Sequence, residues 1–244
     1  MASEGQPGGS NLTACRPVWP ASSMVAIVIP AKDEEQRIHR VLLAAFESKL
    51  ADQVIVVSDG STDRTAQVAR KYKSVQVVEL RRNHGKGGAM LEGVNATEAD
   101  IICFIDADLL GLRGEHVDAI IRPVLEGRCD MCIGVFRGGE YWSDMAQKIS
   151  PYISGQRAMR RELIEGIPYL GELRMGVEVA LKAEAKRRKA RILRVPLRGV
   201  SNCSKEKKLG LVKGTSQRMK MYKEMATAIV KIRKDRRRTR RKRK

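Results

Sequence analysis

The feature that most constrains the fold of this chain is a regular alternation of short apolar runs with amphipathic segments. The apolar runs cover residues 24–29, 53–57, 75–80 and 101–105, and they are rich in valine and isoleucine. Such runs are typical of strands that are buried on both faces of a sheet. Apolar residues recur with helical spacing in the segments between them, as in 33–49. The alternation predicts an α/β fold with a mostly parallel sheet flanked by helices.

The second half of the chain has a less regular pattern. We expect helices over 115–126 and 176–190, a strand over 131–136, and a turn into a helix near Gln156. Residues 192–200 are predicted to form a strand at a sheet edge, because Pro196 lies within them and cannot donate a ladder hydrogen bond.

Four polar loops follow the four predicted strands. They cover residues 31–35, 58–63, 81–88 and 106–109. Because the carboxyl ends of parallel strands meet at one edge of a sheet, these loops should lie close together. Ligands of open α/β sheets bind at that edge. The sequence therefore predicts one binding site formed by four loops.

Asp106 and Asp108 flank the small residue Ala107 directly after the run 101–105. Two carboxylates this close repel each other, and a divalent cation removes the repulsion. Mg²⁺ and Mn²⁺ take oxygen ligands, and Mg²⁺ commonly joins protein carboxylates to substrate phosphates. The turn is therefore a candidate metal site, and the alternative is a pair of solvated turn residues.

Two further loops carry groups that suit a nucleotide. Asp59 can accept the imide N–H of uracil or the N–H groups of guanine, although its neighbours are also ordinary turn formers. The segment 81–88 combines cations with three glycines, so we expect its backbone N–H groups and Lys86 to approach an anion. Its spacing is that of neither a Walker A loop nor GxGxxG.

Charge is concentrated at the C-terminal end of the chain. The formal net charge is +19, and residues 231–244 hold eleven basic residues and one acidic residue. Blocks of like charge repel and stay disordered. Such a tail suits an anionic membrane surface, would also bind RNA non-specifically, or is solvated without a dedicated partner. Aromatic residues make up only 4% of the chain, which disfavours a base-stacking platform.

The N-terminal region and the cysteines indicate the cytoplasm. Residues 1–23 lack the features of a signal peptide, and no apolar run approaches the ~20 residues of a membrane-spanning helix. Five cysteines, an odd number, fit a reducing compartment. Cys129 and Cys132 have CxxC spacing without a second ligand pair, so we interpret them as small buried residues at the start of a strand.

An ordered set of motifs resembles glycosyltransferase family 2, whose members have the Rossmann-like GT-A fold. The similar stretches are IPAKDEE (29–35), VVSDGSTDRT (56–65), NHGKGGAM (83–90), FIDADL (104–109), SGQRAMRREL (154–163), MGVEVAL (175–181) and VPLRGVSN (195–202). They cover about residues 24–212, and the ordered set is far more specific than any one motif. The resemblance implies transfer of a hexose from a UDP- or GDP-sugar, with Mg²⁺ or Mn²⁺ as cofactor.

The resemblance also divides the chain. It implies a glycosyltransferase domain over 24–212, with a nucleotide-binding half at 24–110 and an acceptor half at 111–212. We expect a flexible leader over 1–23, an amphipathic helix over 213–230 and a disordered basic tail over 231–244. The amphipathic segment can pack on the core, lie on a membrane or join two chains as a homodimer, and no motif selects among these. Peripheral attachment to the inner face of the membrane is therefore an alternative to a wholly cytoplasmic location.

Site residues follow from the matched motifs. The residues expected to bind the nucleotide sugar are Pro30, Ala31, Lys32, Glu34, Asp59, Lys86, Asp106 and Ala107. The catalytic candidates are Asp106, Asp108 and Glu178, and the metal candidates are Asp108, Asp106 and Asn202. Asn202 stands where similar enzymes have a histidine, and an amide oxygen ligates a hard cation more weakly.

The acceptor is expected to be anionic. Two subgroups look most similar, namely enzymes that glycosylate polyprenyl phosphate and glucosyl-3-phosphoglycerate synthase. The acceptor-binding candidates are Ser154, Gly155, Arg157, Arg160 and Arg161, and on a helix the three arginines would share one face. The alternative for these arginines is a solvated basic face. The competing functions are nucleic-acid binding through the tail and sugar-1-phosphate nucleotidyl transfer, although the latter would need a glycine-rich loop where IPAKDEE stands.

Overall fold

The computed structural model describes residues 23–137, 155–174 and 176–202. The segment 213–230, the basic tail 231–244, Ser154 and all but Ser23 of the predicted leader lie outside these described residues. In the described part, no helix combines the length and the apolar character that crossing a membrane requires.

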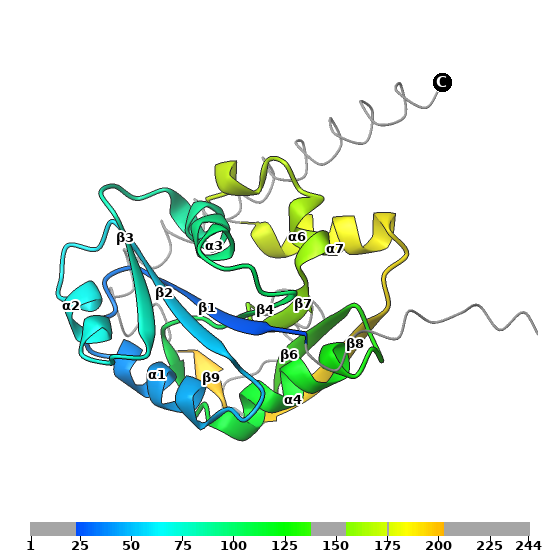
Figure 1. Ribbon diagram of the computed structural model, residues 1–244, viewed down its shortest axis with the longest axis horizontal. Coiled ribbons are helices and arrows are strands. Elements are labelled where there is room, and N and C mark those ends of the chain that lie inside the picture. The colour runs from blue at the N-terminus through cyan, green and yellow to red at the C-terminus, as the bar shows by residue number, and fades with distance from the viewer. Residues whose placement is uncertain (1–22, 138–154, 175, 203–244) are drawn as a thin grey trace, which may run out of the picture.

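A seven-stranded sheet forms the frame of the molecule (Figure 1), with the strand order β3-β2-β1-β4-β7-β6-β8. Its strands are β1 (Val25–Ala31), β2 (Gln53–Asp59), β3 (Val75–Leu80), β4 (Ile101–Phe104), β6 (Met131–Arg137), β7 (Arg157–Arg160) and β8 (Ile192–Arg198). Only β7 runs antiparallel to its neighbours. A separate two-stranded sheet joins β5 (Leu109–Leu110) to β9 (Ser201–Asn202).

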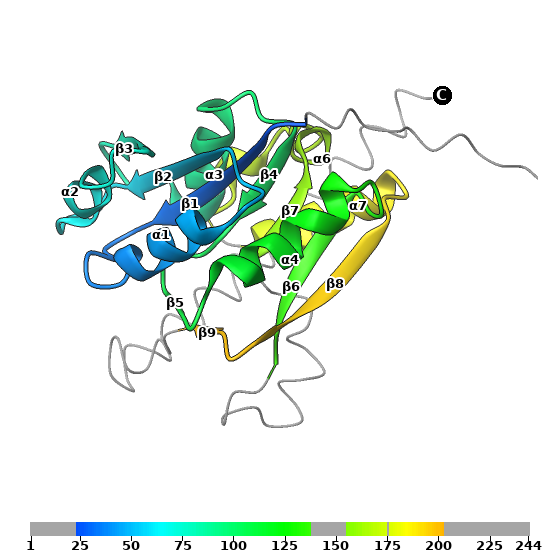
Figure 2. The same cartoon turned by 60° about the horizontal axis from the view of Figure 1, so that its bottom comes forward.

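Helices cover both faces of the sheet. They are α1 (Ile38–Glu47), α2 (Thr65–Arg70), α3 (Gly85–Asn95), α4 (Gly114–Leu125), α6 (Arg161–Glu165) and α7 (Val177–Arg187), with a short 3₁₀ helix η2 (Leu170–Glu172). One apolar core lies between the sheet and α1 and α4, and a second lies between the sheet and α3, α6 and α7. Figure 2 shows α1 and α4 over the near face of the sheet.

The predicted α/β fold with a mostly parallel sheet flanked by helices is confirmed. The strand with Pro196 lies at the sheet edge as expected, and the helix and strand expected over 115–126 and 131–136 are present as α4 and β6. Cys129 and Cys132 are fully buried free cysteines beside the start of β6, as interpreted from the sequence.

The helix predicted to begin near Gln156 is wrong. Residues 157–160 form the strand β7, which pairs with β4 on one side and β6 on the other, and all four of its residues are buried. Pairing on both sides determines this conformation, because a strand in a sheet is selected by its neighbours more than by its own propensity. The shared helical face predicted for the three arginines therefore does not exist.

Two predicted boundaries also differ. The helix expected over 33–49 begins only at Ile38, because Asp33 has a positive φ of 54° and residues before Ile38 bond to the loop after β2. Helix α3 begins at Gly85, so the last residues of the predicted loop 81–88 form its first turn.

Helix α3 is fixed by opposite charges at its two ends. At the N-terminal end, the Asp59 carboxylate accepts hydrogen bonds from the backbone N–H groups of His84 and Gly85 at 2.6 and 2.9 Å. At the C-terminal end, the Arg161 guanidinium donates to the carbonyls of Ala99, Val94 and Thr97. Both charges have the sign that the helix dipole favours.

Replacing Arg161 by methionine should destabilise the fold. The carbonyls that accept from Arg161 would lose a charged hydrogen-bond donor. The free energy of unfolding usually falls by about 1–3 kcal/mol when such groups lose their partner. Urea unfolding should show this loss. Arg113→Met is the control, because Arg113 is 66% exposed and pairs with an exposed glutamate, so removing it should change stability by less than about 1 kcal/mol. Equal stabilities of the two variants would contradict the assigned role of Arg161.

Candidate active site

A cavity of about 410 Å³ opens at the carboxyl ends of β1, β2 and β4. Its walls come from the loops after these strands, from the start of α3, from the start of α7 and from β9. Cavities of roughly 300–1,000 Å³ hold most small-molecule ligands of proteins. The edge of the sheet predicted from the strand and loop pattern is therefore where the structure has its candidate site.

The cavity brings together most of the residues selected from the sequence. All eight nucleotide-sugar candidates line it, as do Asp108, Glu178 and Asn202. The remaining lining residues are Asn83, Gly85, Ala89, Gly176 and Val179. None of the acceptor candidates is among the lining residues, and Ser154 lies outside the described residues.

Lys86 forms the centre of the charged part of the site. Its Nζ lies 2.9 Å from Asp106 Oδ1 and 2.7 Å from Glu178 Oε1. The three side chains are between 11% and 21% exposed, so the two ion pairs are largely shielded from water. The bonds join α3, the turn after β4 and the first turn of α7, which are distant in sequence.

The ion pairs keep Lys86 and Glu178 charged. Burial alone would lower the pKa of Lys86, but Asp106 and Glu178 outweigh it and raise that pKa above the usual lysine value. Burial alone would raise the pKa of Glu178, but Lys86 and the buried Arg157 outweigh it and lower that pKa below the usual glutamate value. Glu178 is therefore an ionised carboxylate at neutral pH, which excludes it as a general acid there.

Asp106 is held on both of its carboxylate oxygens. Lys86 bonds Oδ1, and the side-chain amide of Gln156 donates to Oδ2 at 2.7 Å. Gln156 is fully buried. Gly155 lies against the same carboxylate, since a Cβ at this position would be 2.2 Å from Asp106 Oδ2. Asp106 is therefore held in place by Gly155 and Gln156, just before β7, and by Lys86 of α3.

Asp108 and Asn202 are the candidates that best fit a metal ion. Asn202 of β9 pairs with Leu109 of β5 in the small sheet. Asp108 directly precedes Leu109, so Asn202 lies close to Asp108. Both residues line the cavity and offer hard oxygen donors. Among the described residues, no group of three or more histidines, cysteines, aspartates and glutamates could hold a metal. A Mg²⁺-like ion suits this sparse set, because it is commonly bound by one or two protein groups together with substrate phosphates.

The loop after β1 is locked to the loop after β2. Asp33 Oδ1 accepts a hydrogen bond from the backbone N–H of Thr62 at 2.8 Å, and the backbone N–H of Glu34 donates to Thr65 Oγ1 at 2.8 Å. The ammonium group of Lys32 donates to the carbonyl of Gly60 at 3.1 Å. These contacts fix the wall of the cavity that carries Lys32 and Glu34.

The glycine-rich segment does not present its N–H groups to the cavity as expected. The N–H groups of His84 and Gly85 donate to Asp59, and those of Lys86 and Gly87 donate to the carbonyls of Arg174 and Leu173. A Cβ at Gly85 would lie 2.6 Å from Arg174 Cα, so a glycine here allows close packing of α3 against that chain segment. The predicted anion contact through these backbone groups is therefore wrong, whereas Lys86 itself does face the cavity.

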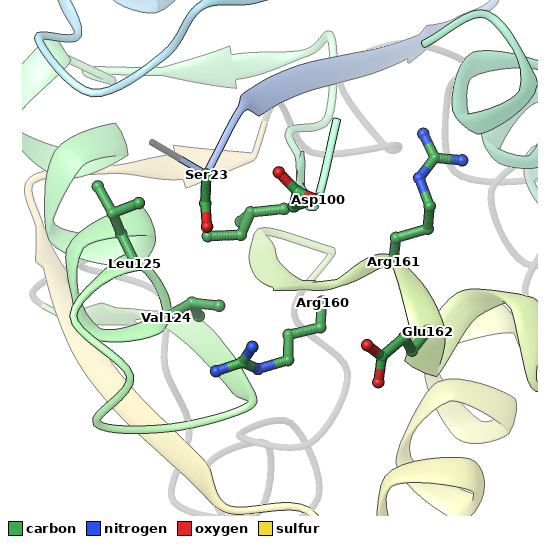
Figure 3. Close-up of a pocket in the computed structure, with 8 residues that line it drawn as sticks. Ser23, Asp100, Val124, Leu125, Arg160, Arg161 and Glu162 are labelled. Carbon is green, nitrogen blue, oxygen red and sulfur yellow. The ribbon is translucent and has the colours of Figure 1, made fainter. Parts of the chain in front are cut away.

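The three arginines of β7 and α6 lie in different places. Arg157 is 1% exposed and interacts electrostatically with Glu178 and Asp106, behind the cavity wall. Arg160 forms an ion pair with Asp130 at 3.4 Å. Figure 3 shows Arg160 and Arg161 beside a second, smaller cavity with Ser23 and Asp100, at the start of β4 and thus at the opposite edge of the sheet. The structure therefore does not bring the three arginines together at one site, and their role in acceptor binding stays a prediction.

Gln156 and Asn83 are polar residues of the site that the sequence reasoning missed. Gln156 lies within a matched motif, but its contact with Asp106 joins residues 50 positions apart and follows only from the pairing of β4 with β7. Asn83 lies in the basic, glycine-rich stretch 81–88. It was missed because the charged side chains of this stretch were the more obvious candidates for ligand binding.

The family of the chain follows from comparison with known proteins. The model of glycosyl transferase family 2 matches residues 26–160, which is more than half of the chain. The chain belongs to glycosyl transferase family 2. It is thus a glycosyltransferase, and the matched region contains Asp59, Lys86 and the Asp106–Asp108 turn.

Two named proteins are similar to this chain over different lengths. The chain is 40% identical over 101 residues to 4,4'-diaponeurosporenoate glycosyltransferase of Staphylococcus aureus (strain USA300), a match that covers 40% of this chain and only 27% of that relative. Glucosyl-3-phosphoglycerate synthase of Mycobacterium tuberculosis has a similar structure. Its complex with phosphoglyceric acid gives a TM-score of 0.63 at 27% identity, covering 75% of this chain and 73% of that one. Its complex with Mn²⁺, UDP and glucosyl-3-phosphoglycerate gives a TM-score of 0.67 at 25% identity, covering 87% of this chain and 80% of that one.

In this family 2 glycosyltransferase, replacing Lys86 by methionine should destabilise the protein by about 3 kcal/mol, because two buried carboxylates would lose their common cation. The pKa of Glu178 is below its unfolded value, so the stabilisation from its ion pair is present above that value and is lost as the pH falls. The difference between wild type and variant should therefore shrink below pH 4.5, the ordinary value for glutamate.

Urea unfolding at several pH values measures this difference. The matched control is Arg70→Met, which removes an ion pair whose partners are 51% and 50% exposed and should change stability by less than about 1 kcal/mol. A loss for Lys86→Met that is no larger than that of the control would show that the buried cluster contributes little to the fold.

Proposed function

We propose that this glycosyltransferase moves a hexose from a UDP- or GDP-sugar to an anionic, phosphate-bearing acceptor, with Mg²⁺ or Mn²⁺ as cofactor. The observation that carries the proposal is the charge of the cavity. Five carboxylates and two lysines line it, which gives a net formal charge of −3. Arg37 pairs with Glu34, and Arg157 lies behind Glu178. Even with these two cations the wall has more negative than positive charge, whereas binding of a free diphosphate would need an excess of positive charge.

A divalent cation resolves this conflict. Held by Asp108 and Asn202, it would neutralise the negative charge that develops on the departing nucleoside diphosphate. Lys86 and Glu178 line the same cavity, and the ion pairs already described hold both side chains in place. The proposed donor site has the diphosphate near Asp108 and the sugar near Glu178.

Asp59 supports the nucleotide end of the same site. Each of its carboxylate oxygens accepts one backbone N–H, and a carboxylate has about four lone-pair positions. It can therefore also accept an N–H of uracil or guanine, and its bonds to α3 hold it in place for that contact. Pro30, Ala31 and Lys32 complete the wall beside it.

The acceptor class is supported by the structural relatives. The Mycobacterium tuberculosis synthase was crystallised with phosphoglyceric acid and, separately, with Mn²⁺, UDP and glucosyl-3-phosphoglycerate. Phosphoglycerate and polyprenyl phosphate both remain candidates for this chain, since they share a phosphate group. A cytoplasmic location, attachment to a membrane through the tail 231–244 and a homodimer stay predictions, and the tail lies outside the described residues.

Binding of the nucleotide should depend on the metal and on Asp108. We expect UDP or GDP to raise the melting temperature only when Mn²⁺ or Mg²⁺ is present, because the cavity is negatively charged. A ligand at about 100 times its dissociation constant adds about 2.7 kcal/mol, a shift that differential scanning fluorimetry detects easily. Asp108→Asn should abolish this shift and the turnover while leaving the melting temperature of the ligand-free protein unchanged.

Glu126→Gln is the matched control, since Glu126 is 46% exposed at the end of α4 and pairs with Arg128 away from the cavity. This variant should behave as the wild type does. Absence of a shift for every nucleotide in the wild type, or a full metal-dependent shift in Asp108→Asn, would contradict the proposed function.

A further inference from the structure

Arg174 and Asn83 form a hydrogen-bonded pair at the cavity. The pair has no role in the site as described above. The guanidinium of Arg174 donates from Nη2 to the side-chain oxygen of Asn83 at 3.0 Å, between residues 91 positions apart. Asn83 lines the cavity, and Arg174 is exposed beside it. The pair therefore lies at the rim, where the cavity opens to solvent.

The position of Arg174 is set by its backbone as well as by this bond. Its carbonyl accepts a hydrogen bond from the N–H of Lys86 at 3.0 Å. Its Cα, Cβ and Cγ pack against Gly85, another residue of the cavity wall. The η2 helix just before it also packs against α3. Arg174 is thus attached to the element that carries Lys86.

The hydrogen bond also orients the amide of Asn83. Because its oxygen accepts from Arg174, its nitrogen is the group that can donate to a ligand in the cavity. A guanidinium has five N–H donors in a planar fork, and only one of them is used by Asn83 in this bond. Two parallel donors of this kind match the oxygens of a phosphate.

The charges of the site give this pair a reason to bind an anion. Lys86 is already committed to Asp106 and Glu178, and the ammonium of Lys32 bonds the carbonyl of Gly60. The rest of the charged wall consists of carboxylates. The guanidinium of Arg174 adds a positive charge at the rim. Its partner in this hydrogen bond is the neutral amide of Asn83 and not a carboxylate.

We propose that Asn83 and Arg174 together form a subsite for a phosphate group of the substrate. The inference rests on the proposed function, since it assumes a phosphorylated ligand in this cavity. The phosphate can come from the donor diphosphate or from the acceptor, and the chemistry of recognition is the same for both.

Calorimetric titration distinguishes the two sources. The first probe is UDP with Mn²⁺, and the second is inorganic phosphate added to the complex of the protein with Mn²⁺ and UDP. If the subsite holds the donor diphosphate, Arg174→Met should weaken UDP binding about tenfold or more, which is the size of one charge-assisted hydrogen bond. If it holds the acceptor phosphate, UDP binding should stay unchanged and binding of inorganic phosphate should weaken instead.

Three further variants sharpen the result. Arg174→Lys should retain part of the affinity, because a point charge replaces the planar fork. Asn83→Asp should weaken phosphate binding more than Asn83→Ala, since a carboxylate would repel the anion. Arg128→Met removes one exposed cation from outside the cavity and should leave both affinities unchanged.

The outcomes separate this inference from the proposed function. Wild-type protein that binds neither UDP nor GDP with Mn²⁺ would overturn the proposed function and this inference with it. Wild type that binds UDP, together with an Arg174→Met variant that matches it for both probes, would overturn the Asn83–Arg174 subsite alone. Thermal unfolding of each variant confirms that it is folded in the titration.

Discussion

The double ion pair of Lys86 with Asp106 and Glu178 is the interaction on which the rest of the site depends. It joins three segments that the chain separates by long stretches of sequence, and it is largely shielded from water. Charges buried in this way are stable only if each has a partner, because an isolated buried charge loses its hydration without compensation. Lys86 therefore links the positions of the two carboxylates, and its displacement would remove their common cation.

Helix α3 supplies the rigid support that this ion pair needs. Asp59 fixes its N-terminal end, Arg161 fixes its C-terminal end, and the carbonyls of Leu173 and Arg174 accept from its first turn. Residues first considered as ligand contacts thus also stabilise the fold. Asp59 combines both properties, since it caps α3 and lines the cavity, whereas Arg161 contributes to stability from the opposite edge of the sheet.

The fold and the location of the site could be predicted from the sequence because both follow from local patterns. Buried parallel strands give continuous apolar runs, and the loops that follow them share one edge, so Asp59, Lys86, Asp106 and Asp108 could be grouped without coordinates. The conformation of 157–160 could not be predicted, because pairing with β4 and β6 determines it. The role of Gly85 was missed for a similar reason, since it depends on the approach of Arg174 from a distant segment.

The two aspartates of the turn differ in what they can offer a metal. Both oxygens of Asp106 already accept hydrogen bonds, from Lys86 and Gln156, so a metal ligated by Asp106 would share these oxygens with the two donors. Asp108 and Asn202 together carry one negative charge. A divalent ion held by these two groups would keep a net positive charge, which weakens its binding to the protein alone and strengthens its attraction to a diphosphate. Metal and nucleotide should therefore bind together, each increasing the affinity of the site for the other.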